Sequence, residues 1–386
     1  MTNLVFKASH GNYPTHWKIS PFEDAFKDTT GGNVKLKQSE YQKNGSIPII
    51  DQGQDKIAGY VDDPELCCEV TLPVILFGDH TKIFKFVSKP FVLGADGVKV
   101  LVPCPELNVK FGYYYLKTVK LPDNAGYSRH YKFLKEVLVP VPPLDEQRRI
   151  AAILDKADAI RLKRQESIRL TEEFLRSTFL EMFGDPVKNP KGWQTNNLGN
   201  ICKKITDGTH DTPKRLSFGM TYITGKHIKP FFIDFGKCDY VSIEDHNEII
   251  KRCKPERGDV LYTNIGANVG TAALNHWDNT FSMKNVALLK PNRKIILPKY
   301  LEFVLNHPGM KQKILGSSSV GGAQQFLSLT QINQIMIPVP THSIQEKFEE
   351  IMIKASKLTD QSNHLLIEKI HLFNSLTQHA FCGELS

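Results

Sequence analysis

The hydrophobic pattern predicts two long amphipathic helices, the first in the middle of the chain. From Asp145 to Phe183 there is no glycine or proline, and apolar residues recur at spacings that alternate between three and four. A period close to 3.5 residues is typical of a coiled-coil seam. The predicted seam consists of Ile150, Ile153/Leu154, Ala157, Ile160, Ser167/Ile168, Thr171, Phe174/Leu175, Thr178 and Met182.

The same pattern returns 198 residues later. Val139-Pro140-Val141-Pro142-Pro143 recurs as Ile337-Pro338-Val339-Pro340-Thr341, and the same offset carries Gln147 onto Gln345 and Phe183 onto Phe381. The second helix is predicted to begin with a capping box, Ser343-x-x-Glu346, and the first with Asp145 as its N-cap. The second seam consists of Phe348, Ile351/Met352, Ala355, Leu358, Leu365/Leu366, Leu372/Phe373 and Leu376.

Neither apolar stripe is stable in water, so the two helices are expected to pair. The first would lead out of one globular segment and the second would run back, which makes the pair antiparallel. A helix rises 1.5 Å per residue, so the predicted spacer is at most about 58 Å long. The alternative is a dimerisation coiled coil that joins two molecules.

The two segments outside the helices, residues 1–142 and 185–342, contain short β-rich runs that end in polar turns. We expect each to be a mixed α/β domain. The predicted fold class is therefore α+β: two mixed α/β domains separated by two long helices in an antiparallel coiled coil, with an internal pseudo-two-fold repeat. The matching runs are Val70–Phe77 with Gly258–Thr263, and Gly45–Ile50 with Gly219–Thr224.

Charge is distributed unevenly along the 386 residues, whose net charge is +8. The helical segments are close to neutral, residues 1–142 carry +2, and residues 184–342 carry +8. A polyanion is the natural partner of such a segment, although solubility alone is the alternative explanation. The seven cysteines show no zinc-binding spacing, and the chain has no signal or membrane-spanning pattern, so a cytoplasmic protein without a metal site is expected.

We find no sequence motif typical of catalysis or cofactor binding. Gly219-x5-Gly225-Lys226-His227 differs from a phosphate-binding loop in its spacing and in its final histidine, and Lys226 is better interpreted as a phosphate contact. No Asn/Asp-Pro-Pro-aromatic run typical of adenine methylation occurs. The acid–base pairs Asp79-His80 and Asp207–Asp211 are interpreted as turn structure. We therefore assign no catalytic, metal or cofactor-binding residue.

Several segments together resemble the specificity (S) subunit of Type I restriction–modification systems, and the resemblance covers essentially the whole chain. It is carried by Pro140–Ile150 at the start of the first helix, by Phe183–Pro186 with Asn189–Trp193 at its end, and by the loops Gly126–Lys132 and Gly322–Phe326. The second copy departs from the first at Thr341–Ile344, and only Gln345 is kept there.

The resemblance implies a non-catalytic, DNA-binding subunit with four parts. These are target-recognition domain 1 (1–142), a central spacer helix (143–184), target-recognition domain 2 (185–342) and a C-terminal spacer helix (343–386). Each domain would read one half of a split, asymmetric sequence in double-stranded DNA, and the helices would fix the gap. Two methyltransferase (modification) subunits and restriction/translocase subunits would bind, and S-adenosylmethionine, ATP and Mg²⁺ would belong to these partners.

DNA recognition requires Lys and Arg for phosphates and polar side chains for base edges. Any one of the candidates could instead be a solvated loop residue or a simple phosphate contact. Two other functions stay open: a coiled-coil adaptor that binds protein or RNA, and a stand-alone nuclease or methyltransferase. The predicted DNA-binding residues are Gln52, Gln54, His80, Thr81, Lys82, Arg129 and His130 in the first domain, and Lys214, Arg215, Lys226, His227, Asn264, Asn268, Ser318, Gln324 and Gln325 in the second.

Overall fold

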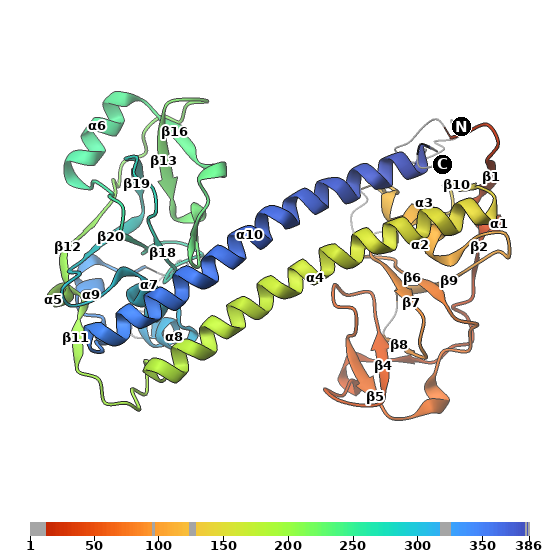
Figure 1. Ribbon diagram of the computed structural model, residues 1–386, viewed down its shortest axis with the longest axis horizontal. Coiled ribbons are helices and arrows are strands. Elements are labelled where there is room, and N and C mark those ends of the chain that lie inside the picture. The colour runs from red at the N-terminus through yellow and green to blue at the C-terminus, as the bar shows by residue number, and fades with distance from the viewer. Residues whose placement is uncertain (1–12, 95–96, 123–128, 317–325, 383, 385–386) are drawn as a thin grey trace. The chain divides into compact units, whose positions relative to one another are not determined.

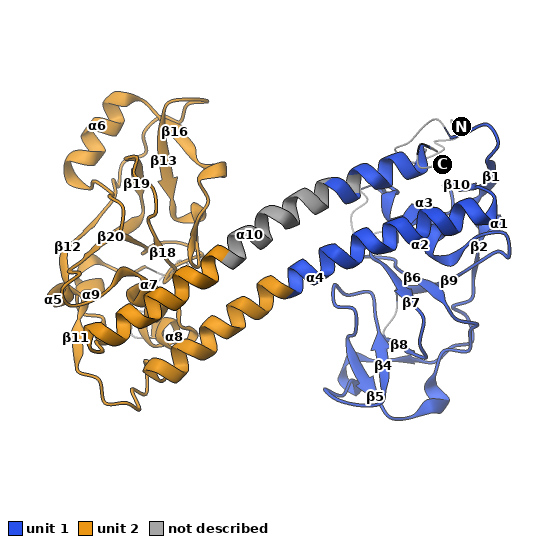
Figure 2. Ribbon diagram, in the orientation of Figure 1, with its two compact units in different colours: residues 1–166, 362–386 blue, residues 167–361 orange. Residues whose placement is uncertain are grey.

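The computed structural model of the chain describes residues 13–94, 97–122, 129–316, 326–382 and 384 (Figure 1). The chain divides into two compact units, residues 1–166 with 362–386 and residues 167–361 (Figure 2). Two helices of 40 residues each, α4 (Leu144–Phe183) and α10 (His342–Phe381), belong partly to one unit and partly to the other. Each unit therefore contains one globular segment, the start of one long helix and the end of the other.

Unit 1 is built on two sheets of four strands each. In the first sheet all neighbouring strands are antiparallel, and the helix α2 (Val109–Thr118) packs against this sheet. In the second sheet β4 (Ile47–Ile50) is parallel to β8 (Val92–Gly94) and antiparallel to β5 (Gly59–Val61). The strand orders are β2 (Phe26–Asp28)-β9 (Val98–Pro103)-β6 (Val74–Gly78)-β7 (Phe84–Val87) and β3 (Lys35–Leu36)-β8-β4-β5.

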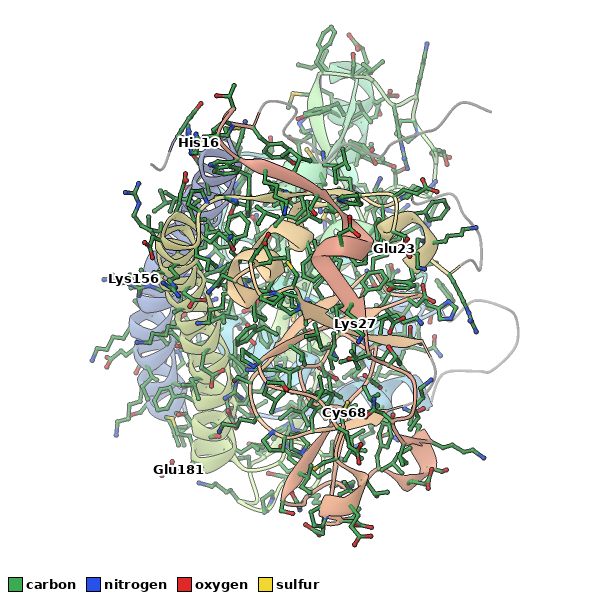
Figure 3. All side chains as sticks on the ribbon, turned by 90° about the vertical axis from the view of Figure 1, so that its right-hand side faces the viewer. His16, Glu23, Lys27, Cys68, Lys156 and Glu181 are labelled. Atoms are coloured by element: carbon green, nitrogen blue, oxygen red, sulfur yellow. The ribbon has the colours of Figure 1, made fainter. Side chains whose placement is uncertain are left out.

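A third, two-stranded pairing in unit 1 joins β1 (Lys18–Pro21) to β10 (Leu138–Val141), which leads directly into α4. The start of β1 is tied to that helix, because Trp17 Nε1 donates to Glu146 Oε1 at 3.2 Å. His16, labelled in Figure 3, lies 3.3 Å from the other oxygen of the same carboxylate. Short helices α1 (Phe22–Ala25) and α3 (Tyr131–Leu134), with 3-10 turns η1 (Gln38–Glu40) and η2 (Pro64–Leu66), complete the unit.

Unit 2 repeats this plan. Its four-stranded antiparallel sheet packs against α7 (Pro298–Asn306), and in its three-stranded sheet β13 (Met220–Thr224) is parallel to β19 (Ser282–Lys284) and antiparallel to β16 (Asp239–Val241). The remaining strands are β12 (Cys202–Asp207)-β20 (Val286–Pro291)-β17 (Val260–Thr263)-β18 (Ala272–Leu274) in the larger sheet, and the pair β11 (Thr195–Asn197) and β21 (Met336–Pro338).

The correspondence between the units follows the sequence matches. The run Gly45–Ile50 contains β4 and its match Gly219–Thr224 contains β13, and these strands occupy the same place in their sheets. Likewise Val70–Phe77 contributes to β6, and Gly258–Thr263 contains β17. Unit 2 adds the pair β14 (Ile228–Lys229) and β15 (Phe232–Ile233), the turns η3 (Gly225–His227) and η4 (Phe235–Lys237), and the helices α6 (Ile243–Arg252) and α8 (Pro308–Gly316); α5 (Leu198–Ile201) and α9 (Leu329–Asn333) correspond to α1 and α3.

A buried glutamine fastens the start of each long helix to its own unit. The side chain of Gln147 accepts from Asn108 N at 2.7 Å and donates to Glu106 O and Pro142 O at 2.8 and 2.7 Å. Both glutamines are fully buried. In the second copy, the side chain of Gln345 accepts from Leu297 N at 2.8 Å and donates to Ile295 O and Pro340 O at 3.1 and 2.9 Å. The one residue kept at both helix starts therefore makes the same contacts twice.

Phenylalanines fasten the far end of each helix to the opposite unit. Phe183, near the end of α4, packs in unit 2 with its ring centroid 4.7 Å from Tyr300 and 5.2 Å from Phe348. Phe381, at the end of α10, packs in unit 1 at 5.4 Å from both Phe111 and Tyr115. Positions related by the 198-residue offset thus complete the core of the unit in which their helix did not begin.

The structure corrects the predicted seam of α4 at three positions, Ile160, Ser167 and Phe174, which are all exposed. Ile160 and Phe174 are exposed by 44% and 55%, and the partly covered positions in the middle of the helix are Arg161 and Arg164 instead. Steps that alternate between four and three residues lead from Ile150 along covered positions to residue 161, and residue 160 lies about 100° away around the helix. The hydrophobic pattern therefore predicted Ile160 where the covered residue is Arg161.

The predicted caps are also displaced. Helix α4 begins at Leu144, so Asp145 lies in its first turn, where it pairs with Arg148 at 3.0 Å. Helix α10 begins at His342, so Ser343 is not its N-cap, and Glu346 pairs with His342 at 3.2 Å. In both cases the helix extends further toward the preceding proline-rich strand than the capping pattern indicated.

Replacing the buried glutamines should destabilise the two units selectively. Gln147→Leu leaves three backbone groups without their partner, at a cost of about 3 kcal/mol in the free energy of unfolding of unit 1. We expect faster amide hydrogen exchange at Asn108 and unchanged exchange at Leu297, and the reverse pattern for Gln345→Leu. Gln165→Leu, at an exposed position of α4, is the control. Equal loss of protection at both amides in either variant would contradict this assignment.

Candidate nucleic-acid interface

Three connections meet at one end of the sheets of unit 1. They are the loop 51–58 after β4, the turn 79–83 between β6 and β7, and Gly97 before β9. Gln52 joins the first two, because its Oε1 accepts from His80 N at 3.2 Å and its backbone oxygen accepts from Thr81 Oγ1 at 2.6 Å. The third joins through Asp79, whose amide donates to Gly97 O at 2.7 Å. The strand order thus gathers loops that are distant in sequence.

A fourth segment, the residues before α3, reaches the same place. His130 N donates to Asp79 O at 2.9 Å, and Tyr131 N donates to Asp79 Oδ1 at 2.7 Å. Arg129 is exposed beside them. Lys82 has a left-handed backbone (φ 61°) and its Nζ donates to Pro122 O at 2.9 Å. Most polar candidates of the first domain are therefore gathered near the buried Asp79.

Lys85 is a residue of this surface that sequence analysis missed. It is buried on β7, and its ammonium donates to Asp51 O at 2.8 Å and Asp55 O at 2.6 Å, on either side of Gln52 and Gln54 in the loop 51–58. Burial lowers the pKa of Lys85 from its ordinary value. The alternation of residues along β7 does not indicate that Lys85 points inward or that it binds the loop after β4, which lies about 30 residues earlier in the chain.

Unit 2 brings the equivalent connections together around a pocket of about 340 Å³. Gly225 and Lys226 follow β13, residues 265–268 lie between β17 and β18, and Asn285 separates β19 from β20. Asn268 Nδ2 donates to Gly225 O at 3.4 Å, which links the first connection to the second. As in unit 1, the segment before the next short helix joins them, because Leu327 N donates to the backbone oxygen of Asn264 at 2.8 Å.

The charged side chains that line this pocket, among the described residues, are Arg215, Lys226 and Lys284. Arg215 and Lys226 both lie against one oxygen of Asp239, at 3.3 and 3.0 Å. Lys284, which sequence analysis also missed, donates to Thr212 Oγ1. It ends β19, so only its place beside the loop after β13, through the parallel pairing of the two strands, brings it to the site.

Three predicted residues are not exposed loop tips. His130 is buried and its Nδ1 lies 3.0 Å from Asp79 O, His227 is buried with its Nδ1 accepting from Thr224 N at 2.9 Å, and Asn264 is buried next to Ile265. Burial lowers the pKa of His227. The two histidines each contact a backbone group of a nearby turn, because a polar side chain next to a strand end can satisfy backbone groups as well as face solvent.

The remaining predictions separate into two groups. Gln54 is exposed on the loop 51–58 of unit 1. Lys214 is exposed in unit 2, and it does not line the pocket there. Ser318, Gln324 and Gln325 lie outside the described residues, as do residues 126–128 and 322–325, which carried part of the family resemblance.

Two motifs considered above for nucleotide binding and for acid–base catalysis have structural roles in the described ranges. Residues Gly225–His227 form the 3-10 turn η3 rather than the start of a helix that follows a phosphate-binding loop. His210 lies 2.9 Å from Asp207, whose other oxygen accepts from Arg252 at 2.6 Å, so this acid–base pair is part of an ion-pair cluster beside β12. Over residues 13–94, 97–122, 129–316 and 326–382 no cluster of metal ligands is found, and no helix has an apolar stretch of membrane-spanning length.

Comparison with known proteins places this architecture. The sequence matches the family described as the Type I restriction modification DNA specificity domain over residues 14–172 and 190–372. Relatives from Escherichia coli include the Type I restriction enzyme EcoBI specificity subunit, 25% identical with 78% of this chain and 70% of that protein covered. The EcoR124I/EcoR124II specificity subunit is 23% identical, with 87% and 86% covered. The crystal structure of the Type I restriction–modification S subunit from M. genitalium superposes with a TM-score of 0.62 at 18% identity, covering 95% of this chain and 96% of that one, which shows a shared fold.

The buried lysine of unit 1 provides a test of how the loop 51–58 is held. Lys85→Met keeps the apolar stem but leaves Asp51 O and Asp55 O without their donor, so the loop should open more often. We expect amide exchange within residues 51–58 to accelerate about tenfold or more, corresponding to ~1.4 kcal/mol. Exchange in β6 and in unit 2 should not change. Lys89→Met, at an exposed position beyond β7, is the matched control, and an unaltered loop in Lys85→Met would refute the role.

Proposed function

This chain belongs to the family of Type I restriction–modification specificity subunits, and from that premise we propose that each unit reads one half of a bipartite, asymmetric DNA site. The observation that carries the proposal is the convergence of the same connections at the same place in both units. A recognition surface built from loops on a rigid sheet scaffold can change its side chains without a change in fold.

The chemistry of the two surfaces supports different half-sites. Unit 1 offers the amide of Gln52 with Thr81 and the exposed Arg129, groups that suit hydrogen bonds to base edges. Unit 2 offers Arg215 and Lys226 around a concave pocket with Asn268. Because the scaffolds agree and the side chains differ, two unlike sequences would be read in one binding event.

We propose that α4 and α10 pair as an antiparallel coiled coil that relates the two units by a pseudo-two-fold axis and sets the distance between the half-sites. Each helix begins in one unit and ends in the other, and the covered positions of α4 follow a 3.5-residue period. A protein with such symmetry suits a target with two halves.

The same frame would carry the catalytic partners. We propose that two methyltransferase subunits bind in equivalent ways on the two halves, that restriction/translocase subunits join them in the cytoplasm, and that the reactions take place on those partners with S-adenosylmethionine, ATP and Mg²⁺. The chain's own part is to bind DNA and to place the partners on it, so the purified chain should show no turnover.

An adaptor that grips protein or RNA is the alternative. It would bind duplex DNA with a salt slope near zero, whereas a DNA-binding subunit loses affinity steeply as salt rises.

Methylation mapping by single-molecule sequencing tests the proposal in cells that express the chain with its cognate modification subunit. The expected result is a split motif with methylated adenines on opposite strands, which also defines both half-sites and the gap. No new methylation from an assembled complex would overturn the proposal in favour of the adaptor.

Shortening both helices should shorten the preferred gap. Deleting seven residues from each, 164–170 in α4 and 362–368 in α10, keeps the 3.5-residue period and removes about 10 Å, or roughly three base pairs. Mapping should show unchanged half-sites and a shorter gap, with weaker binding because the half-sites also rotate around the DNA.

The control for that deletion keeps the helix length. Lys163→Ala and Leu170→Ala, both at exposed positions of α4, should leave the gap as it is. A gap that stays constant in the deletion would show that the helices are not the ruler.

A further inference from the structure

The pocket of unit 2 is a concave site whose described charged lining is entirely cationic. Arg215 comes from the loop before β13, Lys226 from the turn after it, and Lys284 from the end of β19. Polar groups without charge, including Thr224 and Asn268, complete the lining. Three cations at one small cavity repel one another, so such a site is stabilised by an anion.

The carboxylate nearest to these cations does not line the pocket. Asp239, on β16, lies against Arg215 and Lys226 through a single oxygen and is about four-fifths covered. Asp239 therefore holds two of the three cations in place. The three cations outnumber this one carboxylate, so the charged side chains that line the pocket keep a net positive charge. This preorganisation lowers the entropy that a ligand loses on binding, because long side chains are already ordered.

The equivalent surface of unit 1 has a different character. Its nearest lysine, Lys85, is buried and directed to backbone oxygens of its own loop, and Lys82 donates to Pro122 O. The charge of the two globular segments differs in the same sense, +2 for residues 1–142 and +8 for residues 184–342. At the same place in the fold, the two lysines of unit 1 are thus directed to backbone oxygens, whereas those of unit 2 line a pocket.

We propose that the pocket of unit 2 binds a phosphate of the DNA backbone, which makes this unit the electrostatic anchor of the complex while unit 1 contributes mainly base discrimination. This inference rests on the proposed function and assigns the ligand of its second site. A phosphodiester has one negative charge and several acceptor oxygens, and Arg215, Lys226 and Lys284 converge on the pocket from different elements to donate to them.

The test measures the affinity of the full-length chain for duplex DNA as a function of salt. Lys226→Gln and Lys284→Gln should each weaken binding roughly tenfold near 0.1 M salt, equally for cognate and non-cognate duplexes. Each should also reduce the slope of log K against log[salt] by about 0.9. Lys237→Gln is the matched control, since Lys237 is 84% exposed in the same unit and does not line the pocket.

A second measurement identifies which phosphate is bound. Duplexes that carry a single neutral methylphosphonate are scanned through the half-site read by unit 2. At one position the substitution should weaken binding by the wild-type chain and weaken binding by Lys284→Gln clearly less, because part of that phosphate contact is already lost. Inorganic phosphate, titrated by calorimetry, distinguishes a site for free phosphate from one that needs the DNA backbone.

The outcomes separate the pocket from the proposed function. Specific DNA binding with unchanged salt slopes in both lysine variants, or methylphosphonate effects that are additive at every position, would overturn the pocket assignment alone. Tight binding of inorganic phosphate that does not compete with DNA would also overturn it. Absence of any DNA binding by the wild-type chain would overturn the proposed function and this inference together.

Discussion

The structure depends on how the backbone is satisfied where each long helix leaves its globular segment. A buried helix start leaves amide and carbonyl groups that require partners. Gln147 and Gln345 provide them with one side chain each, bridging the helix start to the segment before α2 or α7. A primary amide is suited to this role because it donates and accepts at once. With these bridges, the direction in which each helix leaves its unit is determined by the sheet it follows.

The far ends of the helices make the two units interdependent. Phe381 and Ala380 of α10 belong to the core of unit 1, and Phe179 and Phe183 of α4 belong to that of unit 2. Each core is therefore completed by a helix that began in the other unit. Removal of either helix end would leave buried aromatic residues such as Tyr115 or Tyr300 without their neighbours. The stability of each unit therefore depends on the helix end that completes its core.

The recognition surfaces use a common scaffold in opposite ways. In unit 1 a lysine is buried and holds a loop through backbone oxygens, and in unit 2 lysines line a pocket, one of them paired with a carboxylate. The difference lies in the connections at strand ends, while the order of the matched strands is the same in both units. Under the proposed function, this separation of scaffold and surface would allow two different half-sites to be read on one repeated fold.

The sequence by itself determined the repeat, the two long helices and the matched strands, because periodicity and spacing are local and occur twice. The family was indicated separately, by the resemblance of the segments at the two ends of the first helix. It also located Gln52, Thr81, Lys226 and Asn268 in polar connections. Only the tertiary structure decided which of these connections meet, that His130 and His227 are buried, and that Arg161 rather than Ile160 lies on the covered side of α4. Lys284 gains its role from the pairing of β19 with the distant β13, and Lys85 from the contact of β7 with the loop after β4. No local pattern encodes which distant segments become neighbours.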